Sequence, residues 1–488
     1  MRIALVASEC VPFASTGGLG EVVGALSAEL AQQGSEVAVY MPFYAAMREL
    51  LRHEWKTAIA SITIPFQHSN RFVSVVDGGR HDGVQFYFID CPELFGREGL
   101  YGGPGGEYED NWERFGLFCR AVLEAAKQLG VPEVFHLHDW QAAMVAVYLK
   151  TVYRHDPALR GTATVLTIHN AGYQGTFAAE TVDRLLLPWE VYTPEGVEHY
   201  GRFNFLKGGI TCSERITTVS RKYAEEIQTP AFGASLDGVL RWRRGDLRGI
   251  LNGVDMSEWD PARDGNLAAH YTSERLEGKR ACRADLLHAF GLEGVADGTA
   301  VIGIVSRLVY QKGVDLLADA AKSLGERNVV VVILGTGEAH YEGMMRAWAQ
   351  RSPSQVAVEL RYDDVMAHKV TAGADLVVMP SRYEPCGLNQ MYAMRYGTVP
   401  VVRATGGLDD TVEEWQAETG TGTGVKFHDA TSGALLAALD RALQAFVDDE
   451  QWVKLQRNGM QREFGWAVAA QEYAVVYGEA VRGRGISN

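Results

Sequence analysis

The chain has 488 residues, more than one hydrophobic core usually serves, so we expect two domains. Its 47% hydrophobic and 22% charged residues are the composition of an ordinary globular protein. A net charge of −15 argues against a surface for nucleic acid or for anionic membranes. It does not exclude a bound nucleotide, because a local pair of cations can oppose the overall field.

The cysteines and the N-terminus indicate a reducing compartment. Six cysteines lie far apart with no CxxC pair, which disfavours a disulfide framework or a zinc site. The N-terminal MRIALVASEC is too short an apolar run for a signal peptide and is predicted to form a strand. No stretch approaches the roughly 18 apolar residues of a membrane span. These features predict a soluble, cytoplasmic protein.

A strand, a glycine-rich turn, a helix and a second strand are predicted at the start of the chain, over residues 2–40. Gly18, Gly20 and Gly24 give GxGxxxG rather than the dinucleotide fingerprint, and the second strand ends without an acid for a ribose. A nicotinamide enzyme is therefore disfavoured. The glycines still let the backbone approach a bulky ligand closely.

Strands are next predicted over 62–66, 72–76 and 84–89, followed by a long glycine- and aromatic-rich loop, 91–115. Long loops in compact domains are often functional. The aromatic residues of this loop could stack on sugar rings, but packing of the loop onto its domain is the favoured interpretation for them: Tyr101, Tyr108 and Trp112.

Polar residues follow two more predicted strands, 134–138 and 165–168. Asp139 follows the first, and His169 and Asn170 follow the second. The HxH of the first strand, with Asp139, could form a metal site, but no third ligand stands at a useful spacing.

The α/β alternation restarts near residue 300, after a polar stretch, 262–280, that is predicted to be a linker or a surface helix. Five strands are predicted over 301–306, 329–334, 356–360, 375–379 and 399–403. The fold class is therefore α/β, with two doubly wound Rossmann-like domains facing a central cleft. The domains are predicted over 1–255 and 256–460, with a terminal helix over 461–488 in which Ala470, Tyr473 and Tyr477 recur at helical spacing.

The segment 375–398 is predicted to form a buried strand, a polar loop carrying Glu384, and a helix that Gly387 and Leu388 open and Gly397 ends. Ligands of open α/β sheets bind at the carboxyl ends of strands, and helix starts there favour anions. We expect Glu384 to hold a hydroxyl-rich neutral group while the helix start faces a phosphate. The alternative is a surface loop with a helix-capping carboxylate.

Two cations follow the strand 301–306. Arg307 stands at its carboxyl end and Lys312 just before the next helix. A guanidinium and an ammonium converging there suit a diphosphate, because the guanidinium can form bidentate hydrogen bonds and the ammonium supplies a point charge. The alternative is a pair of solvated surface cations.

The chain resembles bacterial glycogen synthases and plant starch synthases of the GT-B class, nearly from end to end. The matching segments occur in the family's order: TGGLGEV (16–22), PELFGR (92–97), YEDNWERF (108–115), HLHDW (136–140), TIHNAGYQG (167–175), FLKGGI (205–210), GILNGVD (249–255), VSRLVYQKG (305–313), PSRYEPCGLNQMYAMRYGTVPVV (380–402) and TGGLDDTV (405–412). The tail around Trp466 resembles the family helix that crosses back to the first domain.

The resemblance implies transfer of glucose from ADP-glucose to the non-reducing end of an α-1,4-glucan (glycogen or maltooligosaccharide), with retention. It implies that Arg307 and Lys312 hold the donor diphosphate, that Glu384 bonds the transferred sugar, and that His169 contacts this sugar near the reacting centre. Further residues are implied to line the donor site: Gly17 and Gly18 beside the phosphates and sugar, Tyr362 on the base, and Asp139 and Asn170 along the cleft. Cys386, Gly387 and Leu388 belong to the motif around Glu384. Of these, Cys386 is implied to be a packed residue rather than a nucleophile.

No paired carboxylates stand where an ordinary glycosidase needs them. Retention then fits a front-face mechanism, in which the leaving phosphate helps to deprotonate the acceptor hydroxyl. No cofactor or metal is expected, because Arg307 and Lys312 supply the countercharge.

The chain departs from the family pattern at Ser15, where the family usually has a lysine near the donor. Two departures are milder: Glu21 stands where the family often has Asp, and Phe43 stands where a basic residue is common. Three alternatives stay open: a UDP-glucose preference or another acceptor, a sucrose-synthase or trehalose type of GT-B enzyme with a small acceptor, and a non-catalytic glucan-binding paralogue.

Overall fold

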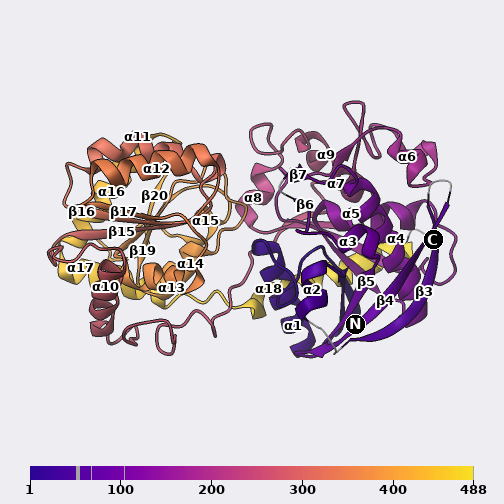
Figure 1. Cartoon of the computed structure of the whole chain (residues 1–488), viewed down its shortest axis with the longest axis horizontal. Helices are drawn as coiled ribbons and strands as arrows, with labels where there is room; N and C mark the ends of the chain where they lie inside the picture. Colours follow the sequence, from indigo (N-terminus) through magenta and orange to yellow (C-terminus); the bar gives the residue numbers. More distant parts are fainter. Residues whose placement is uncertain (51–54, 67–68, 104, 487–488) are drawn as a thin grey trace. The chain divides into compact units, whose positions relative to one another are not determined.

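Two α/β units, each with its own sheet, make up the part of the chain that the computed structural model describes, residues 1–50, 55–66, 69–103 and 105–486 (Figure 1). The first unit contains Met1–Val219, Ala224–Gly253 and the C-terminal segment from Trp466. The second contains Ser220–Tyr223 and Val254–Gly465. Parts of the predicted first domain (51–54, 67–68), loop 91–115 (104) and terminal helix (487–488) lie outside the described residues.

A nine-stranded sheet forms the centre of the first unit, in the order β14-β13-β9-β8-β1-β2-β5-β4-β3. β4 is antiparallel to β3 and β5, and the other neighbours are parallel. The strands are β1 (Arg2–Val6), β2 (Glu36–Pro42), β3 (Lys56–Phe66), β4 (Ser69–His81), β5 (Val84–Asp90), β8 (Val134–His138), β9 (Ala163–Ile168), β13 (Arg215–Thr218) and β14 (Leu247–Gly249). The chain runs outward from β1 through β2 and β5, then returns to β8 on the other side of β1. This reversal creates a topological switch point between β1 and β8.

Helices and short strands complete the first unit. They are α1 (Gly18–Gln32), α2 (Ala45–Leu50), α3 (Pro92–Phe95), β6 (Gly102–Gly103), β7 (Gly106–Glu107), α4 (Asn111–Leu129), α5 (Asp139–Lys150), β10 (Thr176–Phe177), α6 (Thr181–Arg184), η1 (Trp189–Val191), β11 (Glu198–His199), β12 (Arg202–Asn204), α7 (Phe205–Cys212), α9 (Asp237–Trp242) and α18 (Trp466–Ile486). The helix α8 (Arg221–Glu226) is divided between the units. The predicted packing face of α18 is confirmed, since Ala470, Tyr473 and Tyr477 are fully buried.

The second unit has a six-stranded parallel sheet in the order β17-β16-β15-β18-β19-β20. Its strands are β15 (Ala300–Val305), β16 (Val329–Leu334), β17 (Val356–Glu359), β18 (Leu376–Met379), β19 (Val399–Arg403) and β20 (Val425–Phe427). Its helices are α10 (Glu277–Ala289), η2 (Tyr310–Lys312), α11 (Val314–Leu324), α12 (Ala339–Arg351), α13 (Asp364–Gly373), α14 (Asn389–Arg395), α15 (Gly406–Thr411), α16 (Ser432–Phe446) and α17 (Asp449–Met460). This is the dinucleotide-fold strand order, with its switch point between β15 and β18.

Helices cover both faces of the second sheet, as Figure 1 shows for α11 and α12 on one side and α10 and α13 on the other. Alternate residues of β15 enter two different cores. Ile302 and Ile304 pack with α11, α12, α16 and α17, whereas Val301 packs with α10 and α13. Burial on both faces explains why the strands are continuous apolar runs, which made them easy to predict.

The stretch 262–280, predicted to be a linker or a surface helix, is mostly exposed or half-buried, but three of its residues tie it into the second unit. Asp264, Tyr271 and Lys279 are buried, and α10 begins within the stretch. The Lys279 ammonium donates to the Ala372 carbonyl (2.8 Å) and to the Thr398 hydroxyl (2.6 Å). Burial lowers the pKa of Lys279 to about 8, although Asp375 opposes this change. The polar residues were misleading because their partners lie about 100 positions further along the chain.

The predicted loop 91–115 contains α3, β6, β7 and the start of α4. The packing interpretation of its aromatic residues is confirmed for Tyr101, whose buried hydroxyl donates to Glu9. The Trp112 ring stacks on Phe66 at a centroid distance of 6.0 Å.

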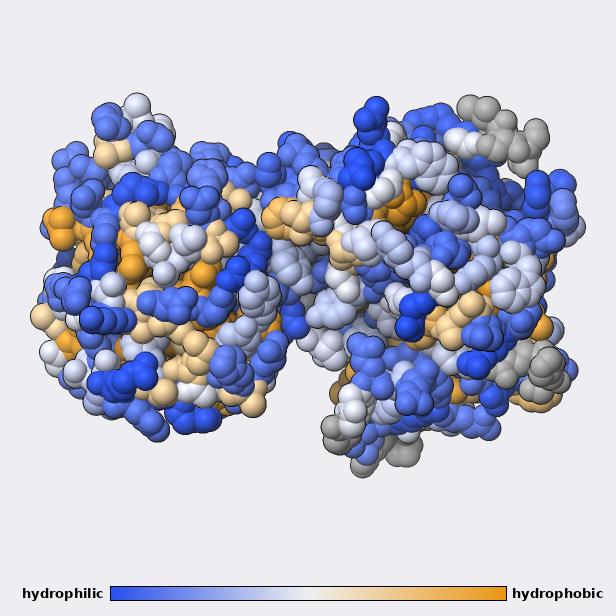
Figure 2. Space-filling view, turned by 90° about the horizontal axis from the view of Figure 1, so that it is seen from above, coloured by the Kyte–Doolittle hydropathy of each residue, from blue (hydrophilic) through white to orange (hydrophobic). Residues whose placement is uncertain are grey.

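Figure 2 shows that hydrophilic side chains cover most of the visible face of each unit, with apolar side chains in small patches. No described helix is long and apolar enough to cross a membrane. All six cysteines are free thiols.

Candidate functional site

An ion pair joins two loops at the switch point of the second unit. Lys312 follows β15, Glu384 follows β18, and these neighbouring strands end at the same edge of the sheet. The Lys312 ammonium lies 2.6 Å from the Glu384 carboxylate, which also accepts a 2.9 Å hydrogen bond from the Ser381 hydroxyl. The side chains are 18% and 6% exposed, respectively. The sequence predicted separate ligands for a phosphate and a sugar at these positions, and the ligand-free structure pairs the two side chains with each other.

Two glycines hold these loops closely together. Gly313 has φ +68°, and a Cβ atom there would lie 2.1 Å from the Pro380 carbonyl oxygen. Gly406 has φ +46°, and its Cβ atom would lie 1.9 Å from the Glu384 carbonyl oxygen. Any larger residue would be strained and would push the loops apart. The backbone therefore fixes the position of the Glu384 carboxylate.

Hydrogen-bond donors without protein acceptors lie on the same loops. The exposed Arg307 side chain, just after β15, forms no ion pair or hydrogen bond with any described residue. The backbone amides of Gly387 and Leu388 likewise have no acceptor among the described residues. By contrast, Arg382 is paired with Asp315. A guanidinium and two amides are thus available to an anionic or hydroxyl-bearing ligand.

The structure places the two remaining candidates of the second unit differently. Tyr362 is 84% exposed in the segment between β17 and α13, so its ring is accessible for stacking. It follows β17, which lies two strands away from β15 in the sheet. Cys386 is buried beside Glu384, which agrees with a packed residue and not with an exposed nucleophile.

In the first unit, Asp139 and His169 follow β8 and β9, which are neighbouring strands. Asp139 has φ +57°, an uncommon conformation for a non-glycine residue that often marks a functional position. Its carboxylate accepts a 2.7 Å hydrogen bond from the His169 amide. Burial raises the pKa of Asp139 to about 7, although the amides of His169 and Asn170 oppose this rise. The Asn170 side chain accepts from the Gly172 amide at 2.9 Å.

Three histidines form a continuous group behind this edge, in which His136 and His138 are buried and His169 is partly buried. His138 Nδ1 lies 2.9 Å from His169 Nε2, and the rings of His136 and His138 are 4.2 Å apart. Burial lowers the pKa of His136 and of His169 to about 3, so both are neutral at neutral pH. The HxH metal alternative is disfavoured, because Tyr477 and Thr167 occupy both ring nitrogens of His136 at 2.9 and 2.6 Å.

The glycines before α1 divide into two groups. A Cβ atom at Gly20 or Gly24 would lie within 2.7 Å of Ser15 or Val11, so packing of α1 against the preceding loop requires these glycines. A Cβ atom at Gly17 or Gly18 would meet no protein atom within 4 Å. Packing therefore does not explain Gly17 and Gly18, and open space lies beside them. The exposed Ser15 hydroxyl donates to the Gly17 carbonyl at 3.0 Å.

Sequence reasoning missed Glu9, a buried carboxylate just after β1. It accepts hydrogen bonds from the Thr16 hydroxyl (2.8 Å) and the Tyr101 hydroxyl, and its charge contributes to the raised pKa of Asp139. The available signal was its position at the carboxyl end of β1, which is equivalent to the positions of Asp139 and His169 on their strands.

Two units with Rossmann-type strand order, each carrying polar groups at its switch point, define a GT-B glycosyltransferase. Residues 2–242 match the family model of the starch synthase catalytic domain, and residues 292–459 match that of group 1 glycosyl transferases.

Relatives match over nearly the whole chain. A glycogen synthase of Koribacter versatilis is 51% identical over 98% of both chains, and one of Thermotoga maritima is 42% identical over 99% of both. The solved catalytic domain of starch synthase IV from Arabidopsis thaliana, bound to ADP and acarbose, is 32% identical over 99% of both chains, with a TM-score of 0.89. The chain belongs to the family of bacterial glycogen synthases and plant starch synthases.

Proposed function

We propose that this chain extends an α-1,4-glucan, by transferring glucose from ADP-glucose to the non-reducing end with retention of configuration. The observation that carries the proposal is the Lys312–Glu384 pair at the switch point, together with the guanidinium of Arg307, which pairs with no described residue. The ADP and acarbose bound to the Arabidopsis relative support a nucleotide-sugar donor and a glucan acceptor.

Arg307 and Lys312 bind the donor diphosphate in this proposal. Breaking the glycosyl–phosphate bond places negative charge on the leaving diphosphate, and fixed donors aimed at such charge contribute roughly 3–4 kcal/mol each in other enzymes. Glu384 is anchored by Ser381 as well as by Lys312, so it keeps a partner when Lys312 turns to a phosphate. Its carboxylate then accepts hydrogen bonds from the hydroxyls of the transferred glucose.

His169 binds without changing charge, and the remaining candidates contact other parts of the donor. The neutral imidazole of His169 hydrogen-bonds the glucose near its anomeric carbon, and His138 fixes its ring orientation. Asp139 and Asn170 line the site, the open space beside Gly17 and Gly18 admits the phosphates and sugar, and Tyr362 stacks on the base.

The leaving phosphate oxygen takes the proton of the acceptor hydroxyl on the face from which it departs. No side-chain nucleophile is required in this proposal. It includes no cofactor or metal in the reaction, because Arg307 and Lys312 provide the countercharge.

The test is incorporation of label into glycogen by purified protein, with ADP-[14C]glucose and UDP-[14C]glucose in parallel. We expect faster incorporation from ADP-glucose. Faster incorporation from UDP-glucose would overturn the donor assignment, for which Ser15 is the residue to examine. Label in a small sugar acceptor but not in glycogen would favour a small-acceptor enzyme, and retained glycogen binding without incorporation from either donor would favour a non-catalytic paralogue.

A further inference from the structure

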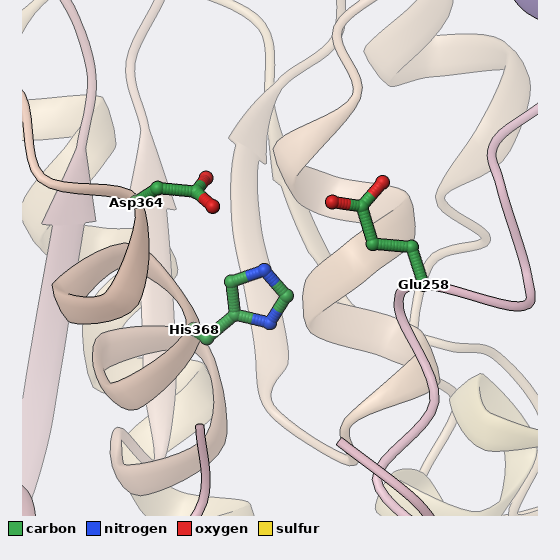
Figure 3. Close-up of side chains that lie close together, drawn as sticks. All are labelled: Glu258, Asp364 and His368. Atoms are coloured by element: carbon green, nitrogen blue, oxygen red, sulfur yellow. The ribbon is translucent and has the colours of Figure 1, made fainter. Parts of the chain in front are cut away.

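Three potential metal ligands converge in the second unit, and none of them is assigned to the donor site above (Figure 3). Glu258 lies in the segment that follows Val254, and Asp364 and His368 lie one turn apart on α13. Figure 3 shows the carboxylates of Glu258 and Asp364 facing each other across the imidazole ring of His368. One ligand atom of each residue lies within 4.8 Å of those of the other two.

The His368 ring is held rigidly and is almost completely buried. Its side chain is 3% exposed, and its Nδ1 lies 2.7 Å from the Asp264 carboxylate, which also accepts from the Tyr396 hydroxyl at 2.7 Å. The ring stacks on Trp259 at a centroid distance of 3.8 Å and an interplanar angle of 12°. These contacts fix both the position of the ring and, through Asp264, its tautomer.

The second ring nitrogen of His368 is left without a partner. Hydrogen bonding of Nδ1–H to Asp264 places the lone pair on Nε2, and no described residue forms a hydrogen bond with Nε2. A carboxylate that orients a histidine from behind is the usual support of a metal-bound imidazole. Because the His368 side chain is almost completely buried and no described residue bonds Nε2, this nitrogen points to a ligand from outside the chain.

Negative charge is concentrated beside this nitrogen. The exposed carboxylates of Glu258 and Asp364 form no ion pair and accept no hydrogen bond from any described residue. A cation would remove the repulsion between these groups.

We propose that Glu258, Asp364 and His368 bind one divalent transition-metal ion of the Zn²⁺ class, with water at the remaining positions. Imidazole with carboxylates suits such an ion, whereas Mg²⁺ and Ca²⁺ prefer oxygen ligands alone. Ligand atoms of a tetrahedral Zn²⁺ site, each about 2.0–2.2 Å from the ion, are about 3.3–3.5 Å apart. The three ligand atoms here all lie within 4.8 Å of one another, and the two carboxylates are exposed, so they can turn inward to close around an ion.

This ion would join the segment that follows Val254 to α13. It has no role in the proposed glucosyl transfer, so the two proposals can fail independently. The site is structural, and metal binding and thermal stability, rather than activity, are its readouts.

Isothermal titration of the metal-free full-length protein with Zn²⁺ tests the site, with Co²⁺ absorbance as a second probe. We expect one saturable Zn²⁺ per chain and a rise in Tm. The double variant Glu258→Gln/Asp364→Asn changes only exposed side chains, and we expect it to fold normally, to lose at least about a hundredfold in affinity and to lose the rise in Tm. Asp264→Asn, which acts through His368, is expected to lose about 10- to 100-fold.

The matched control is Glu418→Gln, which removes one exposed carboxylate of the same unit away from the cluster. It should bind Zn²⁺ as the wild type does. Absence of saturable binding to the wild type would overturn the proposal, as would equal Zn²⁺ affinity in the double variant. Displacement of Zn²⁺ by an equal concentration of Mg²⁺ would overturn the assigned metal class.

Discussion

Replacing Lys312 with methionine isolates the ion pair at the candidate site. The change leaves Glu384, 6% exposed, with the Ser381 hydroxyl as its remaining side-chain partner. Removing one member of a buried ion pair costs about 3–5 kcal/mol in the free energy of unfolding. Because the Lys312 side chain is 18% exposed and water can reach the position, we expect the lower limit, about 3 kcal/mol.

The double variant Lys312→Met/Glu384→Gln distinguishes this charge effect from simple loss of packing. It leaves no unpaired buried charge, so we expect it to regain about 2 kcal/mol relative to Lys312→Met alone. Glucosyl transfer should not recover with stability. Lys312→Met, Glu384→Gln and the double variant are each expected to lose at least about a hundredfold in turnover, because each lacks a group assigned to the donor.

Urea unfolding provides the stability values and ADP-[14C]glucose incorporation the activities. Unfolding is followed by circular dichroism and by tryptophan fluorescence, and free energies are compared where the two transitions coincide. Lys322→Met is the matched control, because Lys322 is an exposed lysine on α11. The reasoning is refuted if Lys312→Met is as stable as the wild type, or if the double variant is no more stable than Lys312→Met.

Four further variants test other parts of the account. Arg307→Ala should reduce turnover at least about a hundredfold with an unchanged circular dichroism spectrum, because one such donor stabilises the transition state by roughly 3–4 kcal/mol. Unchanged turnover would remove Arg307 from the site. Ser15→Lys should change the ratio of the ADP-glucose and UDP-glucose rates, and an unchanged ratio with an unchanged rate would make this departure neutral. Tyr362→Ala should raise KM for ADP-glucose more than it lowers kcat, without loss of stability, because the ring is exposed; an equal KM would argue against stacking on the base. Burial lowers the pKa of His136 to about 3. The neutral buried imidazole therefore contributes fully to the free energy of unfolding above the pKa of a histidine in the unfolded chain, near 6.5, and this contribution is lost as the pH falls toward 3. Between pH 6 and 4, His136→Gln should therefore reduce the pH slope of the unfolding free energy by about 1.4 kcal/mol per pH unit, and an unchanged slope would contradict a neutral buried imidazole.

The sequence predicted the sheets more completely than their connections. The runs 329–334 and 375–379 agree with β16 and β18 within one residue, because strands buried on both faces are continuously apolar. Once the strands 301–306 and 375–379 are recognised, Lys312 and Glu384 are placed just after strand ends, without any contact being known. The resemblance then supplied the expected roles.

Contacts between residues far apart in sequence could not be predicted. The pairing of Lys312 with Glu384 and the hydrogen bond from Lys279 to Thr398 join residues 72 and 119 positions apart. The support of His368 by Asp264, 104 positions before it, likewise leaves no local pattern. Polar residues in such pairs look like surface residues in the sequence, which is why 262–280 was interpreted as a linker or a surface helix.

The most direct test of the central claim is calorimetric titration of the wild type and Arg307→Ala/Lys312→Met with ADP and with AMP. If these cations hold a diphosphate, the wild type will bind ADP more tightly than AMP, and the double variant will lose most of that preference. Equal preference for ADP in both proteins would show that the diphosphate binds elsewhere.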